Sequence, residues 1–402
     1  MFNILLFQQH YYPEMAGCAR RAQELSEKLK KNGHSVTVFT TFPREFRSIP
    51  GYTPKKYEVL NNVKVIRSKT IFTVGINPLL RIFSYFMYAI ISFHFISRNK
   101  SKYDILISIA PLPSAIGPAL AQKFYKIFHH FDVPDILPDL GISAGMIKNK
   151  LVISFLYKLE KWVYNHSNSI SAITHGQINN IHNKGVSLKK LSYIPDWVDN
   201  TFFKENLELY KSEVMQSLGQ FNKKFISFIG NIGALQNPII FLKIMAALDK
   251  DEYNEFQFLF IGDGIMLPQL KRKAEELKLK NVKFVGRIKR ELVPAYMNFS
   301  DILVANYLPN LYMDICVPLK LYEYAISGSP IVMGARGEAK NLIEKYDLGI
   351  TVAPSDVNGF KKAIIQISNG SYEFKPKIEP FIKDFSLQNV SKLYDHVIAK
   401  KA

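Results

Sequence analysis

The feature that most constrains the fold is an alternation, almost from end to end, of short β-branched or aromatic runs with amphipathic stretches. This alternation is typical of βαβ units, which build parallel sheets covered by helices. The first helix is predicted at Cys18–Asn32 and ends at Gly33, since glycine closes helices at low cost in the left-handed conformation. Strands of the first half are predicted at Asn3–Phe7, Ser35–Thr40, Val63–Arg67, Asp104–Ile109, Ser169–Ile173 and Leu191–Ile194.

The same pattern starts again in the second half of the chain. Its strands are predicted at Lys224–Gly230, Phe256–Ile261, Val282–Val285, Ile302–Ala305, Ile331–Met333 and Ile350–Val352. A chain of 402 residues is also too long for one ordinary core, because domains split beyond roughly 250 residues. We therefore predict an α/β protein with two Rossmann-like, doubly wound parallel-sheet domains that face each other across a cleft. The predicted parts are domains at 1–198 and 223–384, a polar linker at 199–222, and an amphipathic C-terminal helix at 385–402.

Composition excludes several other classes of protein. With 48% hydrophobic and 21% charged residues, the chain is neither disordered nor collagen-like. The cysteines, Cys18 and Cys316, lie far apart and outside any CxxC or Cys/His cluster, so the sequence supports neither a disulfide framework nor a zinc site. The residues Met1–Gln8 lack the basic start of a secretory signal and read as a buried strand. We expect a cytoplasmic protein without a metal or cofactor.

The chain is strongly basic, with 52 Lys and Arg against 34 Asp and Glu, and the excess lies in the first half. Residues 1–200 hold 25 basic and 12 acidic side chains, whereas residues 201–402 hold 27 and 22. A basic surface attracts nucleic acid or anionic lipid, although a charge run can equally be a solvated face. No nucleic-acid-binding motif is present, so the sequence favours an anionic membrane surface as partner and no nucleic acid.

The segment 71–102 carries the sequence's main membrane signal. Its apolar stretch, Ile82–Ile96, is shorter than the roughly 20 residues of a membrane span and is bracketed by cations such as Arg81 and Arg98. This pattern predicts a segment that lies in the lipid headgroup region, with aromatic rings buried and cations on phosphates. The alternative is a wholly buried helix of the α/β domain. The membrane interpretation places the protein peripherally on the inner face of the cell membrane.

Glycine turns follow several predicted strands, where ligands of parallel sheets bind. Gly17 precedes the first helix, whose N-terminal N–H groups could approach a phosphate or sugar oxygen. In the second domain, Gly230, Asn231 and Gly233 follow the opening strand, and Gly264 follows the next. These turns suit backbone contact with a diphosphate or a base, but each could be only a turn. None forms a GxGxxG or P-loop motif, so dinucleotide binding and ATP hydrolysis have little support.

The most informative segment is Pro318–Pro330, which enters a helix after the strand at Ile302–Ala305. Lys320 stands near the start of this helix, and Glu323 lies one turn further along the same face. A lysine can neutralise a diphosphate while a glutamate accepts hydrogen bonds from a ribose diol, so the pair describes a nucleotide-sugar site. The alternative is a surface Lys–Glu pair without function.

These residues carry a resemblance to a known family. Pro318–Pro330 resembles the P-x-K-x-x-E-Y-x-A-x-G-x-P region of retaining glycosyltransferases with the GT-B fold, in the large family numbered four. The stretch Asp135–Asp139 is similar to the D-L-W-P-E stretch of the branch that contains the N-acetyl-L-fucosamine transferases of O-antigen and capsule assembly. Further similar stretches, in the same order as in the family, are Tyr12–Gly17, Arg21–Leu25, Gly33–Val38, Glu160–Tyr164, Ile194–Asp199 and Gly337–Glu338.

The resemblance implies metal-independent, retaining transfer of a sugar from a nucleoside diphosphate, with UDP expected. It implies a polyprenyl-diphosphate-linked glycan as acceptor and an N-acetylated deoxy-hexosamine, such as N-acetyl-fucosamine, as the sugar. Asp135 and Asp139 would line the acceptor side of the active site, and Lys320 would bind the leaving diphosphate. The resemblance also implies that Gly17 contacts the donor's phosphate or sugar and that Glu323 contacts its ribose. The other predicted donor-binding residues are Gly230, Asn231, Gly233, Gly264, Arg287 and Glu338.

Two positions depart from the family pattern. The family usually has two glutamates eight positions apart, of which Glu323 would be the second. The first would fall on position 315, where this chain has Ile315, with Asp314 beside it. The basic residue usual after the opening glycine loop of the second domain is also missing, and Arg287 or Lys289 could replace it. Two other functions therefore remain: a sugar-nucleotide epimerase on the same architecture, and a basic membrane-binding protein without activity.

Overall fold

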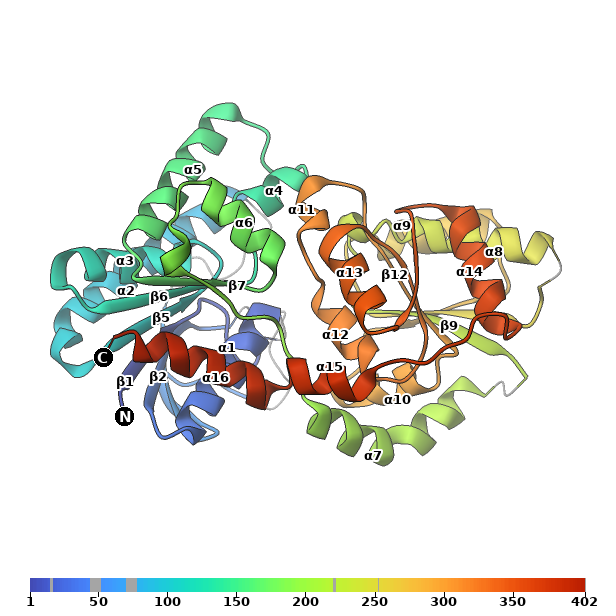
Figure 1. Ribbon diagram of the computed structural model, residues 1–402, viewed down its shortest axis with the longest axis horizontal. Coiled ribbons are helices and arrows are strands. Elements are labelled where there is room, and N and C mark those ends of the chain that lie inside the picture. The colour runs from blue at the N-terminus through green and yellow to red at the C-terminus, as the bar shows by residue number, and fades with distance from the viewer. Residues whose placement is uncertain (15–16, 44–51, 70–77, 220–221, 252, 402) are drawn as a thin grey trace. The chain divides into compact units, whose positions relative to one another are not determined.

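The chain folds into two compact units, which we describe from a computed structural model (Figure 1). Unit 1 comprises Met1–Pro195 and Gln388–Ala402, and unit 2 comprises Asp196–Leu387. The structure describes the chain except for residues 15–16, 44–51, 70–77, 220–221, 252 and 402 and the side chains of residues 78–82.

Unit 1 is built on a sheet with the strand order β3-β4-β2-β1-β5-β6-β7-β8. All neighbouring strands are parallel except β3 and β4, which pair antiparallel. The strands are β1 (Asn3–Phe7), β2 (Ser35–Thr41), β3 (Tyr57–Leu60), β4 (Val63–Ser68), β5 (Ile105–Ile109), β6 (Phe128–Val133), β7 (Ser169–Ala172) and β8 (Leu191–Tyr193). The helices are α1 (Gly17–Lys31), α2 (Pro78–Asn99), η2 (Lys100–Lys102), α3 (Pro113–Tyr125), α4 (Asp139–Ser143), α5 (Lys150–Asn165), α6 (His175–Asn183), η3 (Leu188–Lys190) and α16 (Leu387–Ala399).

Unit 2 is built on a wholly parallel sheet with the order β11-β10-β9-β12-β13-β14. Its strands are β9 (Lys224–Ile229), β10 (Phe256–Ile261), β11 (Val282–Gly286), β12 (Ile302–Asn306), β13 (Ile331–Gly334) and β14 (Gly349–Val352). Its helices are α7 (Asn200–Leu218), η4 (Ala234–Gln236), α8 (Ile239–Lys250), α9 (Leu267–Glu276), η5 (Arg290–Leu292), α10 (Val293–Asn298), α11 (Leu311–Asp314), α12 (Leu319–Ala325), α13 (Gly337–Lys345), α14 (Val357–Ser368) and α15 (Ile378–Phe385). The prediction of two parallel-sheet α/β domains is confirmed.

The core of unit 2 lies on both faces of its sheet, because successive side chains of a strand point to opposite faces. On β9, Phe225 and Ile229 belong to one buried apolar cluster, whereas Ile226 and Phe228 belong to another. Strands buried on both faces need continuous apolar runs rather than alternating ones. This is why KFISFI and FQFLFI are recognisable as strands from the sequence.

Two strands of unit 1 do not appear among the predicted ones. Strand β6 carries the sequence FHHFDV, whose polar residues argue against a buried strand, yet His129, His130 and Asp132 are all buried there. They are tolerated because they have polar partners: the His129 ring bonds Ser108, at 2.7 Å, and Ser167. Strand β3 is short and lies at the edge of the sheet, where its side chains are largely exposed.

The segment predicted as a linker, 199–222, contains a helix of unit 2 instead. Helix α7 runs over Asn200–Leu218 and contacts α10 and η5. The Asp199 side chain accepts a hydrogen bond from the Phe202 N–H, and Gly219 ends the helix at φ +61°. Only Phe203, Val214 and Leu218 are buried along α7, so the sequence lacks the apolar periodicity that predicts a helix.

The C-terminal helix returns to unit 1. Helix α15 belongs to unit 2, and the residues of α16 from Gln388 onward belong to unit 1. Along α16, Val390, Tyr394 and Val397 are buried, whereas Leu393 is exposed. Asn32 donates a hydrogen bond to Asp395 at 3.0 Å, which ties the end of α1 to α16.

Helix α2 contains most of the predicted membrane segment, of which residues 71–77 lie outside the described part of the chain. One side of the helix packs inward, with Tyr88, Ser92 and Ile96 buried. The other side exposes Phe86 and Ile90, so α2 is not wholly buried in the domain. Among the described residues, no helix has the length and apolar character needed to cross a membrane.

Candidate functional site

The strand order of unit 2 identifies the edge of its sheet where a ligand is expected. From β9 the chain continues to β10 and β11 on one side, and then to β12, β13 and β14 on the other. The order therefore reverses between β9 and β12. Ligands of open parallel sheets bind outside the carboxyl ends of the strands at such a reversal. The segments that follow β9 and β12 contain the predicted Gly230 turn and Lys320.

Lys320 is the second residue of α12 and reaches this carboxyl edge. Its Nζ lies 3.8 Å from the centroid of the Phe228 ring on β9. The amine is enclosed and has no hydrogen-bond partner among the residues that the structure describes. Burial lowers the pKa of Lys320 to about 7, although the nearby Glu323 carboxylate opposes this change. An enclosed amine without a partner is costly, and an anionic ligand would supply the missing partner.

Helix α12 is fixed to β9 by Tyr324. The buried Tyr324 hydroxyl accepts a hydrogen bond from the Ile229 N–H at 2.8 Å and donates one to the Ile229 carbonyl at 3.1 Å. Pro318 occupies the N-cap position of the helix. Glu323 is half-buried and lies one turn after Lys320. The sequence PLKLYEY thus places the cation and the carboxylate on a helix whose orientation is set by a buried tyrosine.

The glycine turns after β9 and β10 pack against each other and against Lys320. Gly230 has φ +128°, and a Cβ there would lie 3.3 Å from both Cε and Nζ of Lys320. A Cβ on Gly262, at φ +135°, would lie 1.9 Å from the Gly230 carbonyl oxygen. Gly264 approaches Ile232 in the same way, with 2.3 Å between a Cβ and the Ile232 carbonyl oxygen. Gly262 and Gly264 therefore let two backbone turns meet.

The other predicted residues of this opening turn differ in exposure. Asn231 is exposed, whereas Gly233 is buried. The Gly233 N–H donates to Gln236 Oε1 at 2.8 Å, so it already has a partner within the protein. The exposed Asn231 side chain can therefore contact a ligand that binds at this turn.

The predicted residues Asp314, Glu338 and Arg287 lie around the same sheet. A Cβ on Gly337, at φ +54°, would lie 1.9 Å from the Asp314 carbonyl oxygen, so the end of α11 meets the start of α13. Glu338 is half-buried in the first turn of α13, which follows β13. Arg287 is exposed directly after β11. Arg287 follows the edge strand β11, on one side of β9, whereas Glu338 follows β13, on the other side. The two residues therefore flank Lys320 from opposite sides.

In unit 1, the structure brings Asp135 near the start of α1. Gly17 is exposed at the first position of α1, and Cys18 follows it. Burial, with a further contribution from the Asp135 carboxylate, raises the pKa of the Cys18 thiol to about 11. Asp135 itself is exposed in the loop after β6. The Asp135 carboxylate thus lies close enough to the start of α1 to disfavour ionisation of the Cys18 thiol.

Asp139 is held in a cluster of ion pairs on the same unit. It begins α4 and accepts hydrogen bonds from Lys184 Nζ and from the Tyr157 hydroxyl, each at 2.7 Å. Lys184 also contacts both carboxylate oxygens of Glu160 at 2.9 Å. Burial raises the pKa of Glu160 to about 7, with Lys184 opposing the change. This cluster fixes α4, α5 and α6 to one another, so Asp139 has a structural role in the structure as it stands.

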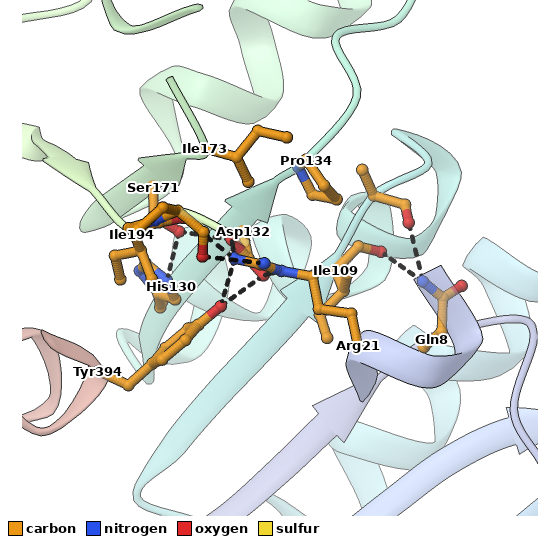
Figure 2. A network of polar contacts seen from close by, with 12 residues as sticks. Gln8, Arg21, Ile109, His130, Asp132, Pro134, Ser171, Ile173, Ile194 and Tyr394 are labelled. Carbon is orange, nitrogen blue, oxygen red and sulfur yellow. Dashed lines mark hydrogen bonds and ion pairs between the residues drawn. The ribbon is translucent and has the colours of Figure 1, made fainter. Parts of the chain in front are cut away.

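A buried polar network surrounds Asp132, which is not among the predicted site residues (Figure 2). Arg21 Nε lies 2.7 Å from Asp132 Oδ2, and the Tyr394 hydroxyl donates to the same oxygen at 2.7 Å. Ser171 donates to Asp132 Oδ1 at 2.7 Å. Burial alone would raise the pKa of Asp132, but Arg21 and these hydrogen bonds hold it below its usual range. Figure 2 shows that the network joins segments far apart in the chain.

This network supports both predicted loops of unit 1. Arg21 lies four residues after Gly17 on α1, and Asp132 lies three residues before Asp135. Close by, the Gln8 side chain donates to the Ala110 carbonyl at 2.8 Å, joining the segments that follow β1 and β5 (Figure 2). A charged residue inside a run with strand character is the sequence signal that points to such a network. Among the described residues, no group of three or more His, Cys, Asp or Glu side chains is placed to hold a metal ion.

Two family models match successive parts of the sequence. Residues 15–202 match the family model described as Glycosyltransferase Family 4, and residues 223–369 match the model described as Glycosyl transferases group 1. The chain is 24% identical over 377 residues to a protein of Escherichia coli (strain K12) named as a colanic acid biosynthesis glycosyl transferase, WcaI, covering 90% of this chain and 91% of that one. It is 26% identical over 212 residues, half of each chain, to the Campylobacter jejuni protein named GalNAc-alpha-(1->4)-GalNAc-alpha-(1->3)-diNAcBac-PP-undecaprenol alpha-1,4-N-acetyl-D-galactosaminyltransferase.

Solved structures show the same fold. Sucrose-phosphate synthase from Thermosynechococcus elongatus superposes with a TM-score of 0.79 at 15% identity and covers 100% of both chains. Anabaena Alr3699/HepE, solved in complex with UDP and glucose, gives a TM-score of 0.73 at 14% identity and covers 99% of this chain and 100% of the other. Both are GT-B glycosyltransferases. Because the two family models match successive parts that together span most of the sequence, the chain belongs to the family 4, group 1 glycosyltransferases and has the GT-B fold.

Proposed function

We propose that this glycosyltransferase moves a sugar from a UDP-sugar to a polyprenyl-diphosphate-linked glycan during the synthesis of a surface polysaccharide. The transfer retains the anomeric configuration and needs no metal ion. It takes place at the inner face of the cell membrane, with which the protein associates peripherally. The transferred sugar is an N-acetylated deoxy-hexosamine such as N-acetyl-fucosamine.

The observation that carries the proposal is the enclosed amine of Lys320 at the carboxyl ends of β9 and β12. The donor diphosphate would accept hydrogen bonds from this amine and neutralise it. Glu323 would accept hydrogen bonds from the ribose hydroxyls, since it lies one turn along the same helix. Asn231, Arg287 and Glu338 would complete the donor contacts. The complex of a structural neighbour with UDP and glucose supports this choice of donor.

The rate of the reaction would come mainly from stabilising negative charge on the departing diphosphate. Lys320 is suited to this role because an enclosed cation interacts more strongly with an anion than a solvated one does. The Gly230 turn beside its Nζ leaves space for phosphate oxygens that a side chain would fill. Loss of one such interaction typically costs about 3 kcal/mol of transition-state stabilisation.

The acceptor side of the reaction would be formed by unit 1. Gly17 would contact the donor, and the exposed Asp135 carboxylate, which lies near the start of α1, can accept a hydrogen bond from an incoming hydroxyl. Asp139 would act by holding α4 beside this loop rather than by touching the acceptor. The printed name of the Campylobacter jejuni relative contains a PP-undecaprenol-linked glycan, and that of the Escherichia coli relative refers to colanic acid. These names support a lipid-linked acceptor.

The decisive experiment compares two Lys–Glu pairs with the same spacing. Lys320→Ala and Glu323→Ala should each reduce transfer roughly tenfold or more, with little change in melting temperature. Lys273 and Glu276 form an exposed pair on α9 with 2.8 Å between Nζ and Oε2, and their alanine variants serve as matched controls. Normal kinetics in both site variants would refute the donor site.

The same assay distinguishes transfer from the alternative reaction. The family matches give the epimerase no support, and that reaction would release an altered UDP-sugar without any acceptor. We expect UDP release only when a lipid-linked acceptor is present, in buffer with or without EDTA. Proton NMR of the product should show the anomeric configuration of the donor. Epimerised donor in the absence of acceptor would instead establish the epimerase.

A further inference from the structure

Helices α2, α3 and α5 are among those that cover one face of the sheet of unit 1. Helices α2, α3 and α5 lie in the successive connections β4 to β5, β5 to β6 and β6 to β7, which all advance across the sheet in one direction. Since such connections are right-handed, helices that advance in one direction lie on one face. Helix α1 connects β1 to β2 in the opposite direction and lies on the other face. The three helices therefore form a layer, which we call the α2–α3–α5 layer (Figure 1).

The helices of this layer pack closely against one another. Gly117 of α3 approaches α2 so closely that a Cβ there would lie 2.1 Å from Ser92 Oγ. The rings of Phe93 and Tyr125 stack with 6.0 Å between their centroids, and Tyr125 donates a hydrogen bond to Ser97 at 3.0 Å. Helix α3 in turn contacts α5. Contacts thus run from α2 through α3 to α5.

Large apolar side chains are exposed on this outer side. Leu151 and Phe155 lie on the first turns of α5, where 82% and 64% of their surfaces are exposed. The exposed apolar residues of the layer are Phe83, Phe86 and Ile90 on α2, Phe124 on α3, and Leu151, Val152 and Phe155 on α5. Exposed apolar side chains gathered on one surface mark interaction sites rather than ordinary surface.

The layer carries no exposed carboxylate. Helices α2 and α3 contain no Asp or Glu, and the acidic residue of α5, Glu160, is buried and paired with Lys184. Asp139, the first residue of α4, is paired with the same lysine. Cations are present instead: Lys150, Lys158 and Lys161 line a shallow cavity of about 450 Å³ along α5, together with Ile153 and Tyr157. Lys123 lies beside the exposed Phe124 ring on α3.

We propose that the outer side of the α2–α3–α5 layer docks on an anionic lipid bilayer, with α5 contributing the most exposed apolar side chains. The proposal rests on the membrane association in the proposed function and extends it beyond α2. The apolar residues would insert at the level of the acyl boundary, while the lysines would contact lipid phosphates. The absence of carboxylates matches the negative potential of such a surface, on which each lysine adds to the attraction.

Vesicle flotation with the full chain tests this proposal. The vesicles contain phosphatidylglycerol with phosphatidylcholine, or phosphatidylcholine alone. We expect binding to the anionic vesicles, and a fall in the partition coefficient of roughly tenfold or more for Leu151→Ser with Phe155→Ser and for Phe86→Ser with Ile90→Ser. Tyr57 and Val59 are exposed on edge strand β3 outside the layer, so Tyr57→Ser with Val59→Ser is the matched control.

Charge reversal tests the cationic part separately. Lys150→Glu with Lys158→Glu should weaken binding to anionic vesicles, whereas Lys30→Glu with Lys31→Glu, on α1 of the opposite face, should have a much smaller effect. Unchanged melting temperatures would show that the variants fold. The proposal is overturned if the wild-type protein does not bind anionic vesicles, or if it binds them and none of the layer variants weakens that binding.

Two further measurements separate this proposal from the proposed function and from another occupant. With a short-chain, water-soluble acceptor, the layer variants should retain wild-type transfer while losing transfer to acceptor embedded in vesicles. If the wild-type protein transfers sugar to neither acceptor, the proposed function is contradicted but the docking surface is not. Sedimentation velocity tests for a dimer. If the protein forms a dimer that the same substitutions dissociate, and does not bind vesicles, the layer contacts a second copy of the chain and the proposal is overturned.

Discussion

The charge of Lys320 changes close to neutral pH. Burial beside the Phe228 ring lowers its pKa to about 7, so its amine is charged below this pH and largely neutral above it. A nucleotide-sugar diphosphate keeps its charge throughout this range and binds the charged amine more strongly. We therefore predict that donor affinity is highest below about pH 7 and falls roughly tenfold or more between about pH 6.5 and about pH 8.5.

Isothermal titration calorimetry checks this prediction in two buffers with different ionisation enthalpies. Donor binding at about pH 8 should take up a proton, because the bound diphosphate raises the pKa of Lys320 again. The control is Lys320→Met, which should bind weakly with little dependence on pH. A wild-type affinity that stays constant over this range would mean that the amine does not face the diphosphate.

Gly262 provides a second residue-level prediction. A side chain there would meet the Gly230 carbonyl oxygen at 1.9 Å and displace the turn beside Lys320. Gly286 also has positive φ, at +81°, but has no atom within 4 Å of a built Cβ. We expect Gly262→Ala to lower both the melting temperature and donor affinity, and Gly286→Ala to cost only about 1 kcal/mol of backbone strain. Equal losses in the two variants would contradict the close-approach argument.

Single residues also show how far the sequence predicts the site. Lys320 and Glu323 are predicted to bind the donor because a helix start after a strand is a known place for a phosphate and because the surrounding motif is specific. The partners of Asp139 are not recognisable, since Lys184 lies 45 positions away and only the folded chain brings the two charges together. The sequence predicts which residue types gather at the strand ends, but not which carboxylates are already occupied by a lysine.

Among the elements, strands with continuous apolar sequence are predicted with accurate ends. All six strands of the unit 2 sheet correspond to predicted segments. Strand β6 and helix α7 are missed for opposite reasons. The β6 sequence looks too polar because its buried His and Asp side chains have partners on other segments. The α7 sequence looks aperiodic because only a few of its side chains are buried.

The ion pair between α1 and β6 leads to a prediction at the level of elements. Arg21 and Asp132 are both buried, so Asp132→Asn leaves an uncompensated charge and should cost about 3–5 kcal/mol of unfolding free energy. Tyr394→Phe removes one hydrogen bond to the same carboxylate and should cost about 1–2 kcal/mol. Urea unfolding followed by circular dichroism measures both values.

A double variant separates the ion pair from its surroundings. Arg21→Met with Asp132→Leu removes both charges and should cost less than the sum of the single variants, because no unpaired charge is left buried. The exposed pair Lys340–Glu344 on α13, with 3.6 Å between Nζ and Oε1, is the control, and its variants should change stability by less than about 1 kcal/mol. Additive losses at Arg21 and Asp132 would show that the two side chains act independently.

At the level of the whole molecule, the C-terminal helix shows what local sequence leaves undetermined. The apolar face of α16 is predicted from its periodicity, but its place on unit 1 depends on Arg21, Asn32 and Asp132, which lie more than 250 positions earlier. Nothing in the helix itself specifies which sheet it covers. The polar contacts of Tyr394 and Asp395 supply that specificity, because each would lose its partner on any other surface.

Removing this helix should therefore destabilise unit 1, although the deleted residues are the last in the chain. A chain ending at Leu387 lacks the buried Val390, Tyr394 and Val397 and leaves the Arg21–Asp132 pair uncovered. Hydrogen exchange should then accelerate in α1, β6 and β7, whereas β9, β10 and β12 should keep their protection because their core contains no residue of α16. Leu393→Ser, an exposed position on the same helix, is the control. Unchanged protection in unit 1 after the deletion would mean that α16 is only an attachment to a unit that is stable without it.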